Sequence, residues 1–148
     1  MPALAGRESP REQFWQRGNA EDYVQEMTNI RLASISLDCA DPADLATFWA
    51  SLLGGEIAFS SDDFAAVKLQ GIWLSTVRVE NYKEPTWPEG DVAKQIHLDL
   101  AVGDLEGSEA EAIRLGATRA RFQSAPDRFV VLLDPAGHPF CLTTEIPD

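Results

Sequence analysis

Cysteine and histidine are scarce in this chain, with two residues of each among 148. Small secreted domains need several disulfides, so Cys39 and Cys141 alone exclude a disulfide-stabilised scaffold. Basic residues are also few: 12 Lys and Arg stand against 24 Asp and Glu, a formal net charge of −12. Proteins that bind nucleic acids or anionic membrane surfaces rely on Lys and Arg, so this composition argues against both kinds of partner.

Long apolar runs are missing as well. No segment reaches the roughly 18–20 consecutive apolar residues that a transmembrane helix needs. The N-terminus lacks the apolar stretch of a secretory signal, because charged and polar side chains interrupt it. Hydrophobic content of 45% and charged content of 24% are typical of a globular domain. We therefore expect a cytoplasmic protein.

An alternation of polar and apolar residues occurs twice and predicts two strands with different faces, over residues 32–39 and 95–102. In the first, Ser34 and Ser36 share the polar face; in the second, His97 and Asp99 do. Each predicted strand runs toward an Asp that suits a helix N-cap, Asp41 or Asp104. The chain therefore reads as two copies of one unit.

Each unit continues with a helix and three short strands. The predicted helices cover residues 43–53 and 106–115 and end at Gly54 and Gly116. The strands follow at residues 56–60, 64–69 and 72–80, and at 118–123, 129–133 and 140–145. We predict an α+β fold of two βαβββ units, residues 30–80 and 94–146, within a domain of residues 29–148. Pairing them gives a curved mixed sheet around a cleft, with the helices outside.

Residues 1–28 lie outside the repeat and are predicted to form a helical extension. Residues 9–12 have the form of a capping box with proline at the first helical position. The extension carries four large apolar side chains, Phe14, Trp15, Tyr23 and Val24. Two interpretations stay open: these side chains dock on the body or on a second subunit, or the segment precedes a natural start at Met27.

The loop of residues 81–93 joins the two units and carries Trp87 between Pro85 and Pro88. Prolines fix the backbone, so the loop is stiff rather than a random linker. It is either a lid over a cavity or a segment whose Trp87 packs on the outside of the sheet.

These motifs as a set resemble the vicinal oxygen chelate superfamily, which includes glyoxalase I, extradiol dioxygenases, fosfomycin-resistance transferases and bleomycin-binding proteins. Bacterial glyoxalase-like domain proteins are the most similar group. The resemblance covers residues 30–146 and is carried by residues 37–42, 48–49, 53–54, 85–88, 97–100 and 134–142. It implies a homodimer with a small-molecule cleft.

In metal-dependent members of that superfamily, a His, Gln or Glu opens the first strand of each unit and a carboxylate usually lies in a last strand. The resemblance places Ser34, His97 and Cys141 there, with Ser75 or Val77 on the remaining strand. A hard divalent ion such as Mg²⁺ or Mn²⁺ prefers carboxylate and water oxygens, and none of these positions supplies a carboxylate. His97 and Cys141 are only two ligands for Zn²⁺, which takes three or four. We predict no resident metal or other cofactor; the alternative is a divalent ion held by His97.

His97 supports two interpretations. Without a metal it can serve as a general base or a hydrogen-bond anchor, oriented by Asp99 on the same face. It can equally be a structural strand histidine satisfied by its neighbours. Cys141 lies inside a predicted strand and not at a helix N-terminus, which would activate a thiol. We assign no catalytic residue.

The sequence therefore predicts metal-independent binding or sequestration of a small organic ligand. Two alternatives remain: a metal-dependent lyase, isomerase or dioxygenase-like enzyme of the same superfamily, and a structural or regulatory dimer with an unused cleft. The predicted ligand-binding residues lie on the polar strand faces and in the joining loop: His97, Ser34, Cys141, Asp99, Ser36, Ser75, Val77 and Trp87.

Overall fold

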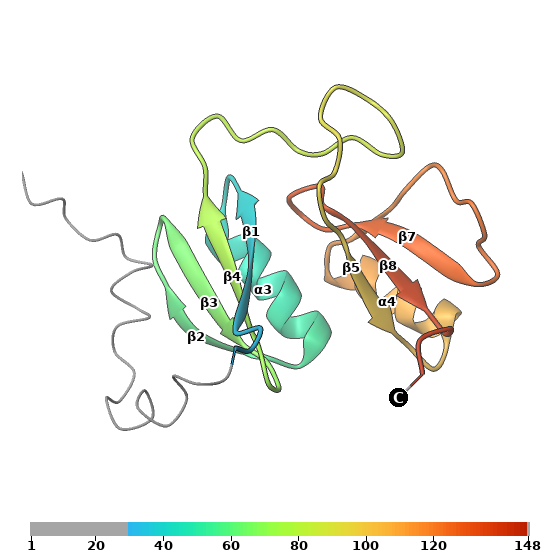
Figure 1. The fold of residues 1–148 in the computed structure, drawn as a ribbon, viewed down its shortest axis with the longest axis horizontal. Helices are drawn as coiled ribbons and strands as arrows, with labels where there is room; N and C mark the ends of the chain where they lie inside the picture. The colour runs from blue at the N-terminus through green and yellow to red at the C-terminus, as the bar shows by residue number, and fades with distance from the viewer. Residues whose placement is uncertain (1–29, 148) are drawn as a thin grey trace, which may run out of the picture.

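A computed structural model describes residues 30–147, which form two four-stranded sheets with one helix each (Figure 1). The first sheet has the spatial order β1 (Ser34–Cys39), β4 (Trp73–Arg78), β3 (Phe64–Lys68), β2 (Glu56–Ser60). The second has the order β5 (Leu98–Ala101), β8 (Pro139–Thr143), β7 (Phe129–Leu133), β6 (Thr118–Arg119). Helix α3 (Pro42–Leu53) follows β1, and α4 (Leu105–Leu115) follows β5. The predicted extension of residues 1–28 lies outside the described residues.

The two sheets repeat one topology. β1 pairs in parallel with β4 as β5 does with β8, and the remaining pairs are antiparallel. This confirms the predicted α+β fold of two βαβββ units. Hydrogen bonding divides the strands into two sheets of four, so the predicted curved sheet is interrupted between β1 and β5. No helix in the described part of the chain is long and apolar enough to cross a membrane.

Both helices begin and end as predicted. The Asp41 carboxylate accepts a hydrogen bond from the Asp44 N–H (3.1 Å), and that of Asp104 accepts one from the Gly107 N–H (3.0 Å). Such caps satisfy N–H groups that have no partner within the helix. α3 ends at Gly54, whose positive φ of 66° suits a residue without a Cβ.

One core joins the two units. The Trp49 ring of α3 lies 5.1 Å from that of Phe140 in β8, between centroids, and both side chains are buried. Leu74 and Leu142 belong to the same core, whereas their strand neighbours Ser75 and Cys141 do not. β4 and β8 therefore alternate between residues that face the main core and residues that face away from it.

Two predicted strands are shorter than expected. β5 begins at Leu98, since its partner β8 begins only at Pro139, which has no N–H to donate. Ile96 consequently lies outside the strand and is 63% exposed, contrary to its predicted place on the apolar face. The other strand, predicted for residues 118–123, forms only over residues 118–119 as β6.

Beyond the end of β6, the Gln123 side chain bonds to the backbone of β7 in place of a longer strand. The Gln123 Oε1 accepts from the Val131 N–H (2.9 Å), and its Nε2 donates to the Val131 carbonyl (2.8 Å). These bonds occupy the backbone groups that a longer β6 would use. The remaining strands match their predicted bounds to within two residues at each end.

Candidate ligand site

Four polar side chains form a continuous row beside the second sheet. The Lys94 Nζ lies 2.8 Å from the His97 Nδ1, and the His97 Nε2 lies 3.3 Å from the Asp99 Oδ1. The Cys141 thiol lies within 4.8 Å of the same Asp99 carboxylate. Because an ammonium group can only donate, Nδ1 is the acceptor and the ring proton sits on Nε2, which donates to Asp99.

The fold explains how this row assembles. His97 and Asp99 are two residues apart and so share one face of the chain. Asp99 is the register partner of Cys141 in the parallel β5–β8 pair, which brings the thiol to the carboxylate. The structure thus brings together three of the residues that the sequence singled out, and the predicted contact between His97 and Asp99 is present.

The row borders a cavity of about 400 Å³, a size typical of small-molecule sites. Its wall is mainly apolar. The lining residues are Trp87, His97, Asp99, Ser124, Phe129, Val131, Cys141, Thr143 and Ile146. It lies on the side of β7 and β8 away from the main core, because Val131 and Cys141 alternate along their strands with core residues.

Trp87 reaches this cavity from the loop that joins the units. Its indole Nε1 donates to the Phe122 carbonyl (3.4 Å), and the Lys94 ammonium lies 5.2 Å from the centre of its ring. These contacts place Trp87 in the cavity wall, where it also packs against Ala120, Val131 and Cys141 on the face of the second sheet, so both interpretations of the loop stay open.

The other predicted residues lie on the first sheet, away from this cavity. Ser34, Ser36 and Ser75 form a hydroxyl cluster, with Oγ–Oγ distances of 3.3 Å from Ser34 to Ser75 and 2.8 Å from Ser36 to Ser75. Val77 follows on the same face of β4, two residues after the fully buried Ser75. A smaller hollow of about 240 Å³, lined by both Ser36 and Lys94, lies between this cluster and the polar row.

Sequence reasoning missed Lys94 and the apolar wall. Lys94 is three residues before His97 in an irregular segment, so the two-residue alternation of a strand gives no reason to place them together. Phe129, Val131 and Ile146 lie on β7 and after β8, and the alternation on β7 could have found the first two. Ile146 follows the last strand, and no sequence signal places it in the wall.

The thiols are not activated. Burial raises the pKa of Cys141, and the neighbouring Asp99 carboxylate raises it further. Burial and the nearby Asp41 raise the pKa of Cys39 to about 11. Both cysteines therefore carry a proton at neutral pH, which makes them poor nucleophiles and poor metal ligands.

Three residues of the row, His97, Asp99 and Cys141, are of types that can bind a metal ion. One ligand atom each of His97, Asp99 and Cys141 lies within 4.8 Å of the others. A hard divalent ion needs mostly oxygen ligands, and only Asp99 supplies them. His97 already accepts from the Lys94 ammonium, and Cys141 is a protonated thiol. These residues therefore do not fit a resident divalent ion.

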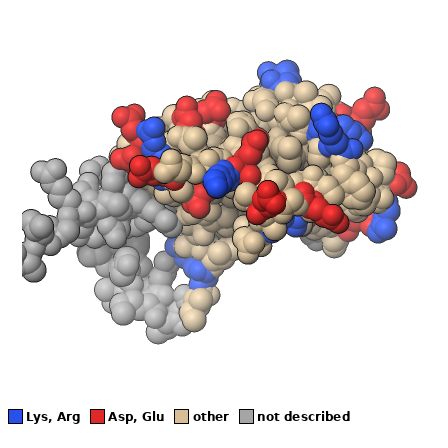
Figure 2. Space-filling model, turned by 90° about the horizontal axis from the view of Figure 1, so that it is seen from above, with Lys and Arg blue, Asp and Glu red and all other residues tan. Residues whose placement is uncertain are grey.

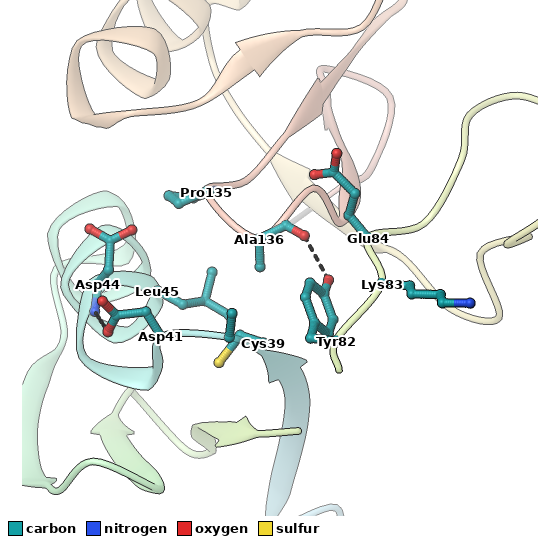
Figure 3. A pocket seen from close by; sticks show the side chains of 10 residues that line it. Cys39, Asp41, Asp44, Leu45, Tyr82, Lys83, Glu84, Pro135 and Ala136 are labelled. Carbon is teal, nitrogen blue, oxygen red and sulfur yellow. Dashed lines mark hydrogen bonds between the residues drawn. The ribbon is translucent and has the colours of Figure 1, made fainter. Parts of the chain in front are cut away.

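A second cavity, of about 580 Å³, opens where the end of β1, the start of α3 and the turn after β7 meet (Figure 3). Its polar contacts serve the fold. Asp41 caps α3, and the Tyr82 hydroxyl donates to the Ala136 carbonyl (2.6 Å), where burial raises the pKa of the phenol. None of the predicted site residues lines this cavity, so the candidate ligand site is the cavity beside His97.

Comparison with solved structures shows the same fold in proteins of low identity. A fosfomycin resistance protein FosX from Mesorhizobium loti is 16% identical, with a TM-score of 0.59 over 80% of this chain and 94% of that chain. A glyoxalase-related enzyme from Fulvimarina pelagi is 18% identical, with a TM-score of 0.58 over 78% of this chain and 88% of that one. A FosX variant from Listeria monocytogenes is 17% identical, with a TM-score of 0.60 over 80% and 94% of the two chains.

Comparison with curated proteins found no sequence match. The glyoxalase-like domain family, in contrast, matches residues 34–143, from the first residue of β1 to the last residue of β8. That range contains both βαβββ units and every predicted site residue. The chain therefore belongs to the glyoxalase-like domain family.

Proposed function

We propose that this protein binds or sequesters a small organic ligand in the cavity beside His97, without a metal ion. The observation that carries the proposal is the make-up of that cavity: an apolar wall faces a row of hydrogen-bonded polar groups. Small-molecule sites commonly combine a mostly apolar surface with a few polar groups that fix the ligand's orientation.

Each part of the cavity has a role in this proposal. Trp87, Phe129 and Ile146 take the hydrocarbon body of the ligand, and its burial drives binding. His97 and Asp99 orient it through hydrogen bonds. Cys141 is only 8% exposed and closes the cavity on the side of β8, with its protonated thiol adding apolar surface.

The alternative is a metal-dependent enzyme. The Listeria FosX variant was solved with Mn(II) and 1S,2S-dihydroxypropylphosphonic acid, which makes a metal-bound reaction the natural comparison. The donor set here favours the metal-free function instead, because Lys94 contacts the one imidazole in the row. The proposal also includes a cytoplasmic homodimer; light scattering of the purified protein would test its subunit number.

The test is a titration with 4-phenylbutan-1-ol, a neutral probe with an aromatic body. We expect saturable quenching of Trp fluorescence, and loss of that signal in Trp87→Phe while calorimetry still detects binding. Phe129→Ala should weaken binding about tenfold, because removing an aromatic ring that contacts the ligand costs upwards of 1 kcal/mol. The matched control is Phe122→Ala, since Phe122 is 49% exposed and does not line the cavity. No saturable binding in the unmodified protein would refute the proposal.

A further inference from the structure

We infer that the cavity selects an organic cation: an amine or related nitrogen base with a compact apolar body. This inference rests on the proposed function and names the chemical class of its ligand. It follows from the Asp99 carboxylate in the cavity wall, from the pairing of the nearby basic side chains with other residues, and from the aromatic rings in the wall.

Asp99 is the one acidic side chain among the lining residues, which otherwise comprise a histidine, apolar groups, hydroxyls and a thiol. A ligand that enters the cavity therefore meets a carboxylate and no lysine or arginine. Because hydrogen bonds to a charged group are stronger than neutral ones, a ligand N–H that carries positive charge gains most from this arrangement.

The Asp99 carboxylate has room for such a ligand. Its side chain is 49% exposed, whereas that of His97 is 29% exposed. An ionised carboxylate offers about four acceptor sites, and the His97 Nε2–H uses one of those of Asp99. Acceptor sites on Asp99 therefore remain for the ligand.

The basic side chains near the cavity are engaged elsewhere. The Lys94 ammonium donates to the His97 Nδ1 and lines the neighbouring hollow, not this cavity. Arg128, which precedes the lining residue Phe129, pairs with Glu145 at 2.6 Å and so presents no net charge. An anionic ligand would meet Asp99 without a free cation in the wall to offset it.

The aromatic wall also favours a cation. The Lys94 ammonium already lies over the Trp87 ring at 5.2 Å, so this structure itself shows an ammonium held against that indole. Phe129 also lines the cavity, and its ring face would attract the positive end of a ligand in the same way.

The charge of the whole chain acts in the same direction. The formal net charge is −12, and acidic side chains are spread over the face in Figure 2, with isolated Lys and Arg side chains among them. Such a field attracts cations and repels anions during approach, and the effect weakens as salt is added.

The experiment compares three probes that share one body: 4-phenylbutylamine, 4-phenylbutan-1-ol and 4-phenylbutyrate, titrated into the full chain at low salt. We expect the amine to bind about fivefold tighter than the alcohol, the size of a partly exposed ion pair. The butyrate should bind more weakly than both. Equal binding of amine and alcohol, or tighter binding of the butyrate, would overturn the inference while leaving the proposed function standing. Failure of all three probes would overturn both.

A pair of variants assigns the preference to one carboxylate. Asp99→Asn keeps an acceptor for the His97 N–H and should bring the ratio of the amine and alcohol affinities close to one. The matched control is Asp91→Asn, an exposed acid of the joining loop that lines no cavity described above; it should keep the full advantage. If Asp99→Asn keeps the advantage too, with a circular dichroism spectrum that shows it is folded, Asp99 is not the selecting group.

Discussion

The Trp49 indole Nε1 donates a 3.0 Å hydrogen bond to the Asp134 Oδ2, and this bond joins helix α3 of the first unit to the turn that precedes β8 in the second. Asp134 is only 4% exposed and accepts two further bonds through its Oδ1, from the N–H groups of Ala136 and His138. The same turn is tied back to the first unit by the His138 Nε2, which donates to the Asp38 carbonyl at 2.6 Å. The turn of the second unit is therefore bonded to both α3 and β1 of the first unit.

We predict that Asp134→Asn destabilises the protein by about 1–3 kcal/mol, the cost of leaving a buried polar group without its partner. All three groups around Asp134 are donors, so the amide NH₂ of asparagine must face one of them whichever way it turns. Urea unfolding would measure the change. Asp44→Asn is the control, because Asp44 is exposed and only its backbone N–H is used. Equal stability of Asp134→Asn and the unmodified protein would contradict the prediction.

Asp134 also predicts a pH dependence. Burial raises the pKa of its carboxyl above the usual value of 3.8, although His138 and the three donors act in the opposite direction. The folded protein then holds a proton that the unfolded chain has lost, so the contribution of Asp134 to stability falls as the pH rises from the unfolded pKa toward the folded one. We expect the stability difference between the unmodified protein and Asp134→Asn to shrink from about pH 4 upward. Urea unfolding of both proteins at several pH values would check it; a difference that grows would show a lowered pKa.

Much of the fold could be predicted because it depends on local patterns that occur twice. The strand alternation, the caps Asp41 and Asp104, and the terminating Gly54 and Gly116 each act within a few residues. Alternation along a strand also places Ser75 and Leu74 on opposite faces of β4, and Cys141 and Phe140 on opposite faces of β8. These features do not depend on how the two units meet.

The parts of the site that could not be predicted depend on long-range contacts. Lys94 meets His97 through an irregular segment, and Ile146 reaches the cavity from beyond the last strand. Gln123 replaces part of a predicted strand because its side chain can bond to both backbone groups of Val131. The grouping of Ser34, Ser36 and Ser75 with His97 in one site was expected from the strand faces, but the structure gives the serines their own cluster.

The thiols should be slow to alkylate. A pKa of about 11 leaves a thiolate fraction of about one in ten thousand for Cys39 at pH 7, and Cys39 is only 1% exposed. Cys141, which lines the cavity and also has a raised pKa, should react faster than Cys39 but more slowly than a free cysteine. Iodoacetamide labelling followed by peptide mass spectrometry would give both rates. A Cys141 rate equal to that of free cysteine would contradict the raised pKa.

Metal analysis tests the absence of a resident ion. We expect protein equilibrated with Mn²⁺ or Zn²⁺ and then gel-filtered to retain well under one ion per chain, because Lys94 contacts His97 and Cys141 is protonated. Any retained metal should be the same in His97→Ala and in His138→Ala, which changes the other histidine of the chain. About one ion per chain, lost in His97→Ala and kept in His138→Ala, would show that metal displaces the Lys94 contact. The cavity would then have to be reconsidered as the active site of a metal-dependent enzyme.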